Sequence, residues 1–346
     1  MKHFIIAVTL VTCSLLGFGQ KTNWDYSKYD SLQIIYSTDS VEYHKYDKKG
    51  KIGIKDKQEK IIVKAKYDEI YSFNNDFALV VIKNKLGFIN LKGEEIIPCK
   101  YDELDFFYEN IVRVKQDGKW GYINDTGEIL VVCKYDYAFN FINGIAKVFY
   151  GETHENGYPK NGKYGIINKK GEELTAVKYD GISNFRNKLA KIRIDDKHGY
   201  INQEGKEIVP CEYDKVWILS KDIIVVKKDY KSGLFNKNGE KISDCKYDVI
   251  GNLYENLTKV EIGGKIGFLD LEGKEIIPCK YDDMLDFSEG LAAVVLNNKC
   301  GFINLEAKEV IACRYDYANP FENGKAKVEL DGEEFYINTK GERIKE

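Results

Sequence analysis

Short apolar runs separated by turn residues recur along most of the chain. In one copy, Gly87 to Ile89 is apolar, Asn90 to Gly93 has the residue preferences of a type I turn, and Ile96 to Tyr101 alternates between apolar and polar positions. A third run with a β-branched residue follows, as in Leu291 to Val294. Because these runs are shorter than ordinary helices, each copy predicts three short strands, the first two joined as a hairpin.

A Tyr-Asp pair sets the period of this pattern. The spacing is 34 residues except for one interval of 44, and each Tyr is followed by Asp: Tyr67, Tyr101, Tyr135, Tyr179, Tyr213, Tyr247, Tyr281 and Tyr315. About ten extra residues near 149–162 account for the long interval. A Gly lies 14 residues before each Tyr, as at Gly87 and Gly121. The chain is therefore predicted to contain eight structural repeats.

Alternation along the second strand predicts one core face and one face toward water. Ile97, Cys99 and Tyr101 fall on the core face, whereas Lys100 and Asp102 share the opposite face, where their charges can pair. A lone hairpin is marginal in water, so neighbouring copies must bury each other's apolar faces. Glu59 and Ala307 replace the turn Gly in two copies, which predicts strained or reshaped turns there.

We expect an all-β fold in which residues 51–328 form eight repeats, with degenerate half repeats at 20–50 and 329–346 as caps. A propeller blade usually needs four strands in about 40 to 45 residues, and a 34-residue unit has room for about three. An open superhelical, solenoid-like array is therefore favoured. A closed, propeller-like toroid is the alternative.

The copy that contains Trp120 resembles the WG-repeat family. Lys119-Trp120-Gly121-Tyr122-Ile123-Asn124 is followed by Tyr135-Asp136 and by the strand Gly144 to Val148, close to the family pattern. The resemblance covers about residues 51–344 and implies a β-rich repeat array without catalytic residues. Seven copies replace the Trp, which indicates a packing position: Ile52, Leu86, Tyr164, His198, Ser232, Ile266 and Cys300.

The composition agrees with a folded β protein, and the charge distribution limits the classes of partner that are expected. Apolar residues make up 43% of the chain, with 25 Tyr and 17 Phe, which favours pleated surfaces. The formal net charge is −3, from 52 basic and 55 acidic residues spread evenly. No basic stripe is present, so nucleic acid is not an expected partner.

The first 19 residues have the layout of a secretory signal peptide. Lys2 and His3 precede the apolar run Phe4 to Leu16, and small residues follow at Gly17 and Gly19. The run is shorter than the roughly 20 residues that a membrane-spanning helix needs, so we expect export and a mature chain without a membrane span. A lipoprotein signal ending at Cys13 is the less favoured alternative.

The cysteines recur at one position of the repeat. Six lie two residues before the Tyr, and Ala65 and Val177 replace them in the other copies: Cys99, Cys133, Cys211, Cys245, Cys279 and Cys313. A position that accepts Cys, Ala and Val is a small apolar core position, which favours free thiols over cross-repeat disulfides. No Cys-x-x-Cys or calcium-loop spacing is present, so neither a metal nor a cofactor is expected.

The insertion at 149–162 breaks the repeat symmetry and is the candidate contact site. Insertions in repeat arrays map to loops on one face, which is often the binding face. Its candidate contact residues are Glu152, His154, Glu155 and Tyr158. We expect a non-enzymatic surface that binds or scaffolds a protein or a cell-envelope glycan. The alternatives are a polysaccharide hydrolase with paired carboxylates in a groove, and a purely structural envelope protein.

Overall fold

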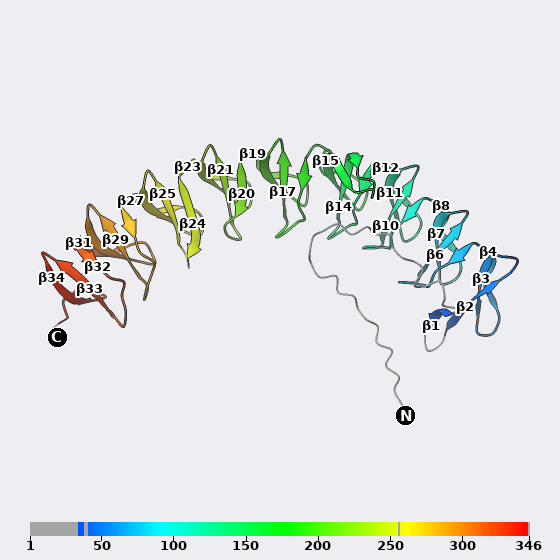
Figure 1. The fold of residues 1–346 in the computed structure, drawn as a ribbon, viewed down its shortest axis with the longest axis horizontal. Coiled ribbons are helices and arrows are strands. Elements are labelled where there is room, and N and C mark those ends of the chain that lie inside the picture. Colours follow the sequence, from blue (N-terminus) through cyan, green and yellow to red (C-terminus); the bar gives the residue numbers. More distant parts are fainter. Residues whose placement is uncertain (1–33, 38–40, 255–256, 345–346) are drawn as a thin grey trace, which may run out of the picture.

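A computed structural model describes residues 34–37, 41–254 and 257–344, and the segment predicted as a signal peptide lies outside these ranges. The described residues form nine small antiparallel sheets and no helix. The sheets follow one another along an open arch, with the first and last sheets at opposite ends (Figure 1). The prediction of an all-β open array is confirmed, and the array does not close into a ring.

The strands lie in each sheet in chain order. Sheet by sheet they are β1 (Ile34–Ser37), β2 (Glu42–Asp47), β3 (Ile52–Asp56), β4 (Ile61–Tyr67); β5 (Glu69–Ile70), β6 (Phe77–Ile82), β7 (Lys85–Asn90), β8 (Glu95–Tyr101); β9 (Glu103–Leu104), β10 (Ile111–Gln116), β11 (Lys119–Asn124), β12 (Ile129–Tyr135); β13 (Tyr137–Ala138), β14 (Ile145–Thr153), β15 (Pro159–Asn168); β16 (Gly181–Ile182), β17 (Leu189–Ile194), β18 (Lys197–Asn202), β19 (Glu207–Tyr213); β20 (Lys215–Ile218), β21 (Ile223–Lys228), β22 (Lys231–Asn236), β23 (Lys241–Tyr247); β24 (Val249–Tyr254), β25 (Leu257–Ile262), β26 (Lys265–Leu269), β27 (Glu275–Tyr281); β28 (Asp283–Met284), β29 (Leu291–Leu296), β30 (Lys299–Asn304), β31 (Glu309–Tyr315); β32 (Tyr317–Ala318), β33 (Lys325–Leu330), β34 (Glu333–Asn338).

Every sheet after the first begins just after a Tyr-Asp pair, and seven of the nine sheets end at a repeated Tyr. The expected hairpin of first and second strands is present, as β7 pairs with β8. The expected third strand, however, pairs with the first strand of the following copy, as β6 does with β7 through Val80 and Gly87. A two-residue strand such as β5 adds a fourth edge strand that the prediction of three strands missed. A sheet therefore joins residues of two consecutive copies.

Gly87 is required by a bulge in the neighbouring strand. Leu86 pairs with Tyr101 and Phe88 with Ile97, so β8 carries extra residues between these two pairs. The bulged backbone crosses close to Gly87, where a Cβ atom would lie 2.4 Å from the carbonyl oxygen of Ile97. The same approach occurs at Gly121, so the repeated Gly is needed because the neighbouring backbone leaves no room for a Cβ atom.

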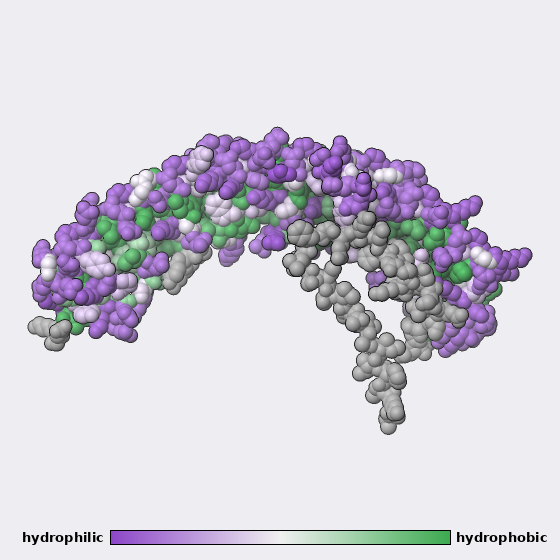
Figure 2. All heavy atoms as spheres, in the orientation of Figure 1, coloured by the Kyte–Doolittle hydropathy of each residue, from purple (hydrophilic) through white to green (hydrophobic). Residues whose placement is uncertain are grey.

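The core lies between successive sheets. Phe88 and Tyr101 of one sheet pack with Val112 and Ile123 of the next in one apolar cluster. The Tyr of every Tyr-Asp pair is at most 3% exposed in this setting. Figure 2 shows polar residues over the outer side of the arch and apolar residues in a band nearer its inner side.

The Asn-x-x-Gly turns have the predicted conformation. The Asn90 side-chain oxygen accepts hydrogen bonds from the backbone N–H groups of Lys92 and Glu94, both at 3.0 Å. Gly93 has a φ of 77°. Glu59 and Ala307 keep the same turn with φ of 62° and 57°, so these two turns are strained but not reshaped.

Candidate functional site

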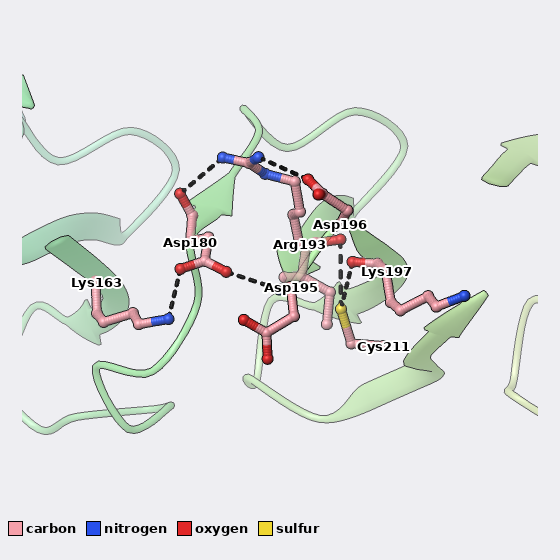
Figure 3. A network of polar contacts seen from close by, with 8 residues as sticks. Lys163, Asp180, Arg193, Asp195, Asp196, Lys197 and Cys211 are labelled. Atoms are coloured by element: carbon pink, nitrogen blue, oxygen red, sulfur yellow. Dashed lines mark hydrogen bonds and ion pairs between the residues drawn. The ribbon is translucent and has the colours of Figure 1, made fainter. Parts of the chain in front are cut away.

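The Asp of each Tyr-Asp pair joins a Lys to a hairpin turn. One oxygen of Asp180 accepts from the Lys163 ammonium at 2.5 Å, and the other accepts from the backbone N–H of Asp195 at 2.8 Å (Figure 3). Every copy has the corresponding ion pair: Lys51–Asp68, Lys85–Asp102, Lys119–Asp136, Lys163–Asp180, Lys197–Asp214, Lys231–Asp248, Lys265–Asp282 and Lys299–Asp316. These Asp side chains therefore cap the hairpin turns.

The expected pairing of Lys100 with Asp102 is wrong. Asp102 pairs with Lys85, because the hairpin turn of the same sheet brings Lys85 beside it. The Lys100 ammonium lies over the Tyr101 ring instead, 5.2 Å from its centre. The Lys side-chain hydrogen bond, and then the backbone hydrogen bond, lower the pKa of seven of these carboxyls: Asp68, Asp102, Asp180, Asp214, Asp248, Asp282 and Asp316.

Four of the repeated Tyr residues connect neighbouring sheets through a carboxylate. The Tyr179 hydroxyl donates to Glu207 at 2.9 Å, and the Lys178 ammonium donates to the same oxygen at 2.9 Å. The same triad of Lys, Tyr and Glu occurs at three other joints: Lys66-Tyr67-Glu95, Lys134-Tyr135-Glu173 and Lys246-Tyr247-Glu275. Burial raises the pKa of Tyr67 and Tyr135 to about 12. These Tyr side chains hold the stack together.

The seven cysteines of the described ranges are free thiols. Cys99 donates to the Val80 carbonyl at 3.6 Å, and Cys211 to the Lys197 carbonyl at 3.0 Å (Figure 3). Burial raises the pKa of Cys99 and Cys313 to about 11. The repeat position is thus a half-buried packing position with little thiolate character.

Trp120 is also a packing residue. It is 6% exposed, and the Arg113 guanidinium lies over its ring at 4.8 Å from the centre. Arg113 in turn pairs with the buried Asp105 at 2.8 Å and donates to the Ala138 carbonyl on the next sheet at 2.7 Å. The surroundings of Trp120 therefore link two sheets.

The insertion forms a longer hairpin, not the expected loop. β14 and β15 stay paired from Ile145 with Asn168 to Thr153 with Pro159. Glu152, His154 and Glu155 are exposed near its tip. Tyr158 is half-buried, and its ring centre lies 5.5 Å from that of Tyr137. The structure thus separates the four candidate residues into three exposed ones and one that packs on the sheet.

A groove lies elsewhere, between the sheets β16–β19 and β20–β23, and is lined by the loops that precede β17 and β21 and by the turns that precede β19 and β23. Its volume is about 420 Å³, within the range of about 300 to 1,000 Å³ typical of ligand sites. We call it the joint groove, and it is lined by Asn187, Lys188, Leu189, Asn202, Gln203, Glu204, Lys206, Ile208, Ile218, Ser220, Lys221, Ile224, Lys237 and Asn238.

The joint groove opens because one apolar side chain packs in the other direction. Six copies have a Phe six residues after the Tyr, and each packs in the cluster shared with the preceding sheet: Phe73, Phe107, Phe141, Phe185, Phe287 and Phe321. Leu219 takes this position after Tyr213 but packs with Leu234 in the cluster shared with the following sheet. The space that a Phe fills at other joints is left open.

The backbone explains this reversal. Six copies have two consecutive residues with positive φ in this loop, as at Asn143 and Gly144. Neither Lys221 nor Asp222 has a positive φ. Instead, the Ser220 hydroxyl accepts hydrogen bonds from the N–H groups of Asp222 and Ile223, at 3.3 and 3.2 Å. Sequence analysis missed the groove, although Leu219 and the absence of Asn or Gly at 221–222 were visible signals.

The described grooves contain few carboxylates. The three larger grooves formed by described residues have volumes of about 420, 270 and 250 Å³, and each contains a single carboxylate: Glu204, Asp117 and Asp286. Within the described ranges, no three His, Cys, Asp or Glu side chains gather in a metal-binding arrangement. In the same part of the chain, no helix is long and apolar enough to cross a membrane.

The repeated sheets, together with the packing and capping roles of the residues that recur in each copy, define an all-β repeat protein. The chain belongs to the WG-repeat family, since the WG containing repeat matches eight segments: 52–85, 87–120, 120–152, 164–197, 199–231, 233–265, 266–300 and 301–333. The predicted family membership is confirmed.

The other comparisons with known proteins do not indicate a function for this chain. No curated protein matches the chain in sequence. Among solved structures, a eukaryotic initiation factor is similar with a TM-score of 0.28 and 11% identity, over 89% of this chain and 96% of that one. The AfRom2 CNH domain has a TM-score of 0.25 and 8% identity, over 69% and 91%. These TM-scores are too low to transfer any property.

Proposed function

We propose that this protein is an exported, non-enzymatic module that binds or scaffolds a protein or a cell-envelope glycan, with the joint groove as its principal contact site. The observation that carries the proposal is the reversed packing of Leu219, which leaves a groove at one joint of an otherwise regular stack. The repeated Tyr side chains are buried between sheets, the repeated Asp carboxylates pair with Lys, and the repeated Cys thiols are half-buried, so we assign all three positions to structure and not to a reaction centre. The N-terminal residue pattern supports export.

The test is to fill the groove and measure capture from the solubilised envelope fraction of the source cells. Ile218→Trp places a large ring at a half-buried position that lines the groove. Pro320→Trp is the matched control, because Pro320 is exposed and has the same place in the last copy. We expect Ile218→Trp to lose the captured component and Pro320→Trp to retain it. Equal capture by both variants, or chemical turnover of the captured material, would contradict the proposal.

A further inference from the structure

The lysines of the joint groove give it a charge opposite to that of the whole chain. The lining contains four Lys and one carboxylate, Glu204, whereas the chain has a formal net charge of −3. Lys237 pairs with Asp222 at 2.6 Å. Lys188 and Lys206 have no ion-pair partner among the described residues. Two uncompensated ammonium groups therefore attract a negatively charged ligand.

Lys206 occupies a turn position that is Lys in three other copies, Lys60, Lys274 and Lys308, and Glu in the rest. In five other turns this position is Glu, and the turn Asn amide donates to its carboxylate: Asn90–Glu94, Asn124–Glu128, Asn168–Glu172, Asn236–Glu240 and Asn338–Glu342. Lys206 replaces this local pair with a cation at the groove. The turn itself is unchanged, since Asn202 still accepts from the Lys206 N–H at 2.9 Å.

The floor and rim of the groove suit a peptide better than a sugar. The apolar lining residues are the aliphatic Leu189, Ile208, Ile218 and Ile224, and the lining contains no aromatic ring on which a sugar could stack. The amides of the rim offer both donors and acceptors, which a peptide backbone requires. Asn187, Gln203 and Asn238 contribute these amides, and Asn202 adds its NH2 group, since its side-chain oxygen caps the turn.

We infer that the joint groove takes an extended acidic peptide segment of a partner protein, with an apolar side chain on the aliphatic floor and carboxylates beside Lys188 and Lys206. This inference rests on the proposed binding function and assigns its ligand class. Attraction between exposed charges is screened by salt, so binding weakens as ionic strength rises.

The test uses a fluorescein-labelled peptide of alternating Glu and Leu, with binding followed by anisotropy. Lys206→Glu should weaken binding about tenfold or more, because it replaces attraction with repulsion. It should not destabilise the fold, since Glu at this position pairs with the turn Asn in other copies. Lys274→Glu is the matched control, at the same turn position of another joint, and should bind the peptide like the unmodified protein.

Two further probes separate the outcomes. A peptide with Ser in place of Leu should bind more weakly, and equal binding would overturn the role of the aliphatic floor. Oligogalacturonate is the rival acidic ligand. If it binds at the groove and the peptide does not, the peptide inference fails while the binding function stands. If Ile218→Trp also has no effect on envelope capture, the proposed function itself fails.

Discussion

Gly127 lies against the carbonyl oxygen of Ile96 on the neighbouring sheet, where a Cβ atom at Gly127 would be 2.3 Å from that oxygen. The turn of one sheet thus packs directly on the backbone of the sheet before it. Gly171, Gly205 and Gly239 make the same approach to Leu130, Leu174 and Ile208. The turn Gly therefore allows both the positive φ of the turn and the close packing of neighbouring sheets.

Gly127→Ala should destabilise the protein by about 2 to 4 kcal/mol, because it adds a clash between sheets to the strain of a positive φ. Gly118→Ala is the control. Gly118 has a φ of 77°, and a Cβ atom there would meet nothing within 4 Å, so only strain of about 1 kcal/mol is expected. Urea unfolding measures both. Equal losses would show that the contact with Ile96 adds nothing.

The two turns that lack Gly should respond differently to restoring it. Glu59 is exposed at φ 62°, so Glu59→Gly should stabilise the protein by about 0.5 kcal/mol after loss of its exposed pair with Lys55. Ala307 is 3% exposed at φ 57°. Ala307→Gly should be near neutral, since losing a buried methyl group, worth about 0.8 kcal/mol, offsets the relief of strain. A thermal shift assay compares the two, and equal shifts would refute the role of the buried methyl.

Much of this architecture was predictable because it recurs. The Tyr-Asp spacing, the Asn-x-x-Gly turns and the alternation at Ile97, Cys99 and Tyr101 are local patterns, and the structure agrees with them. The partner of a strand is not a local property. Alternation along β6 is the same whether it pairs within its copy or with the next one, so the sheet boundary at Tyr-Asp did not follow from the sequence.

The joint groove was less predictable for a similar reason. Leu219 is apolar in either packing, and only the backbone of the loop decides which of two cores receives it. The insertion at 149–162 was visible in the sequence as an exception to the period, but its continued strand pairing depends on the hairpin that it extends.

The triad of Lys178, Tyr179 and Glu207 should contribute measurably to the stack. Tyr179→Phe removes the hydroxyl that donates to Glu207 and should destabilise by about 1 to 2 kcal/mol. In the copy of Tyr101 the position of the carboxylate is held by Ile129, so Tyr101→Phe should cost less than about 0.5 kcal/mol. Chemical denaturation of both variants tests this. A larger loss for Tyr101→Phe would show that the carboxylate is not the stabilising partner.

The Lys–Asp pairs predict a loss of stability in acid. The folded-state pKa of seven Asp carboxyls lies below the ordinary value of about 3.9, because of their Lys and backbone hydrogen bonds. Their contribution is present above the unfolded-state pKa and is lost as pH falls through the folded-state pKa. These groups should change the urea midpoint of unfolding little between about pH 7 and pH 5. At pH values below about 4 the midpoint should decrease.

Asp102→Asn isolates one of these pairs. The variant should be less stable than the unmodified protein at pH 7, because the Lys85 ion pair is lost. The difference should shrink at about pH 3, below the unfolded-state pKa of about 3.9, because proton uptake by the unfolded chain then reduces the contribution of the ion pair to stability. Urea midpoints at both pH values give the result. A difference that is equal at the two pH values would mean that the carboxylate charge is not involved.

Shortening the insertion hairpin tests whether the ligand binds at the hairpin, as the sequence suggested, or in the joint groove, as the structure suggests. Replacing residues 151–162 with Asp-Gly restores the turn that Asp117 and Gly118 form in the preceding sheet, and the new Asp N–H can donate to Asp136 as that of Gly151 does at 2.9 Å. The fold should persist, with a loss of about 1 to 2 kcal/mol from the missing contact of Tyr158 with Tyr137. Acidic-peptide binding should be unchanged, because none of Glu152, His154, Glu155 and Tyr158 lines the joint groove. Loss of that binding in a folded variant, measured by anisotropy, would move the contact site to the hairpin.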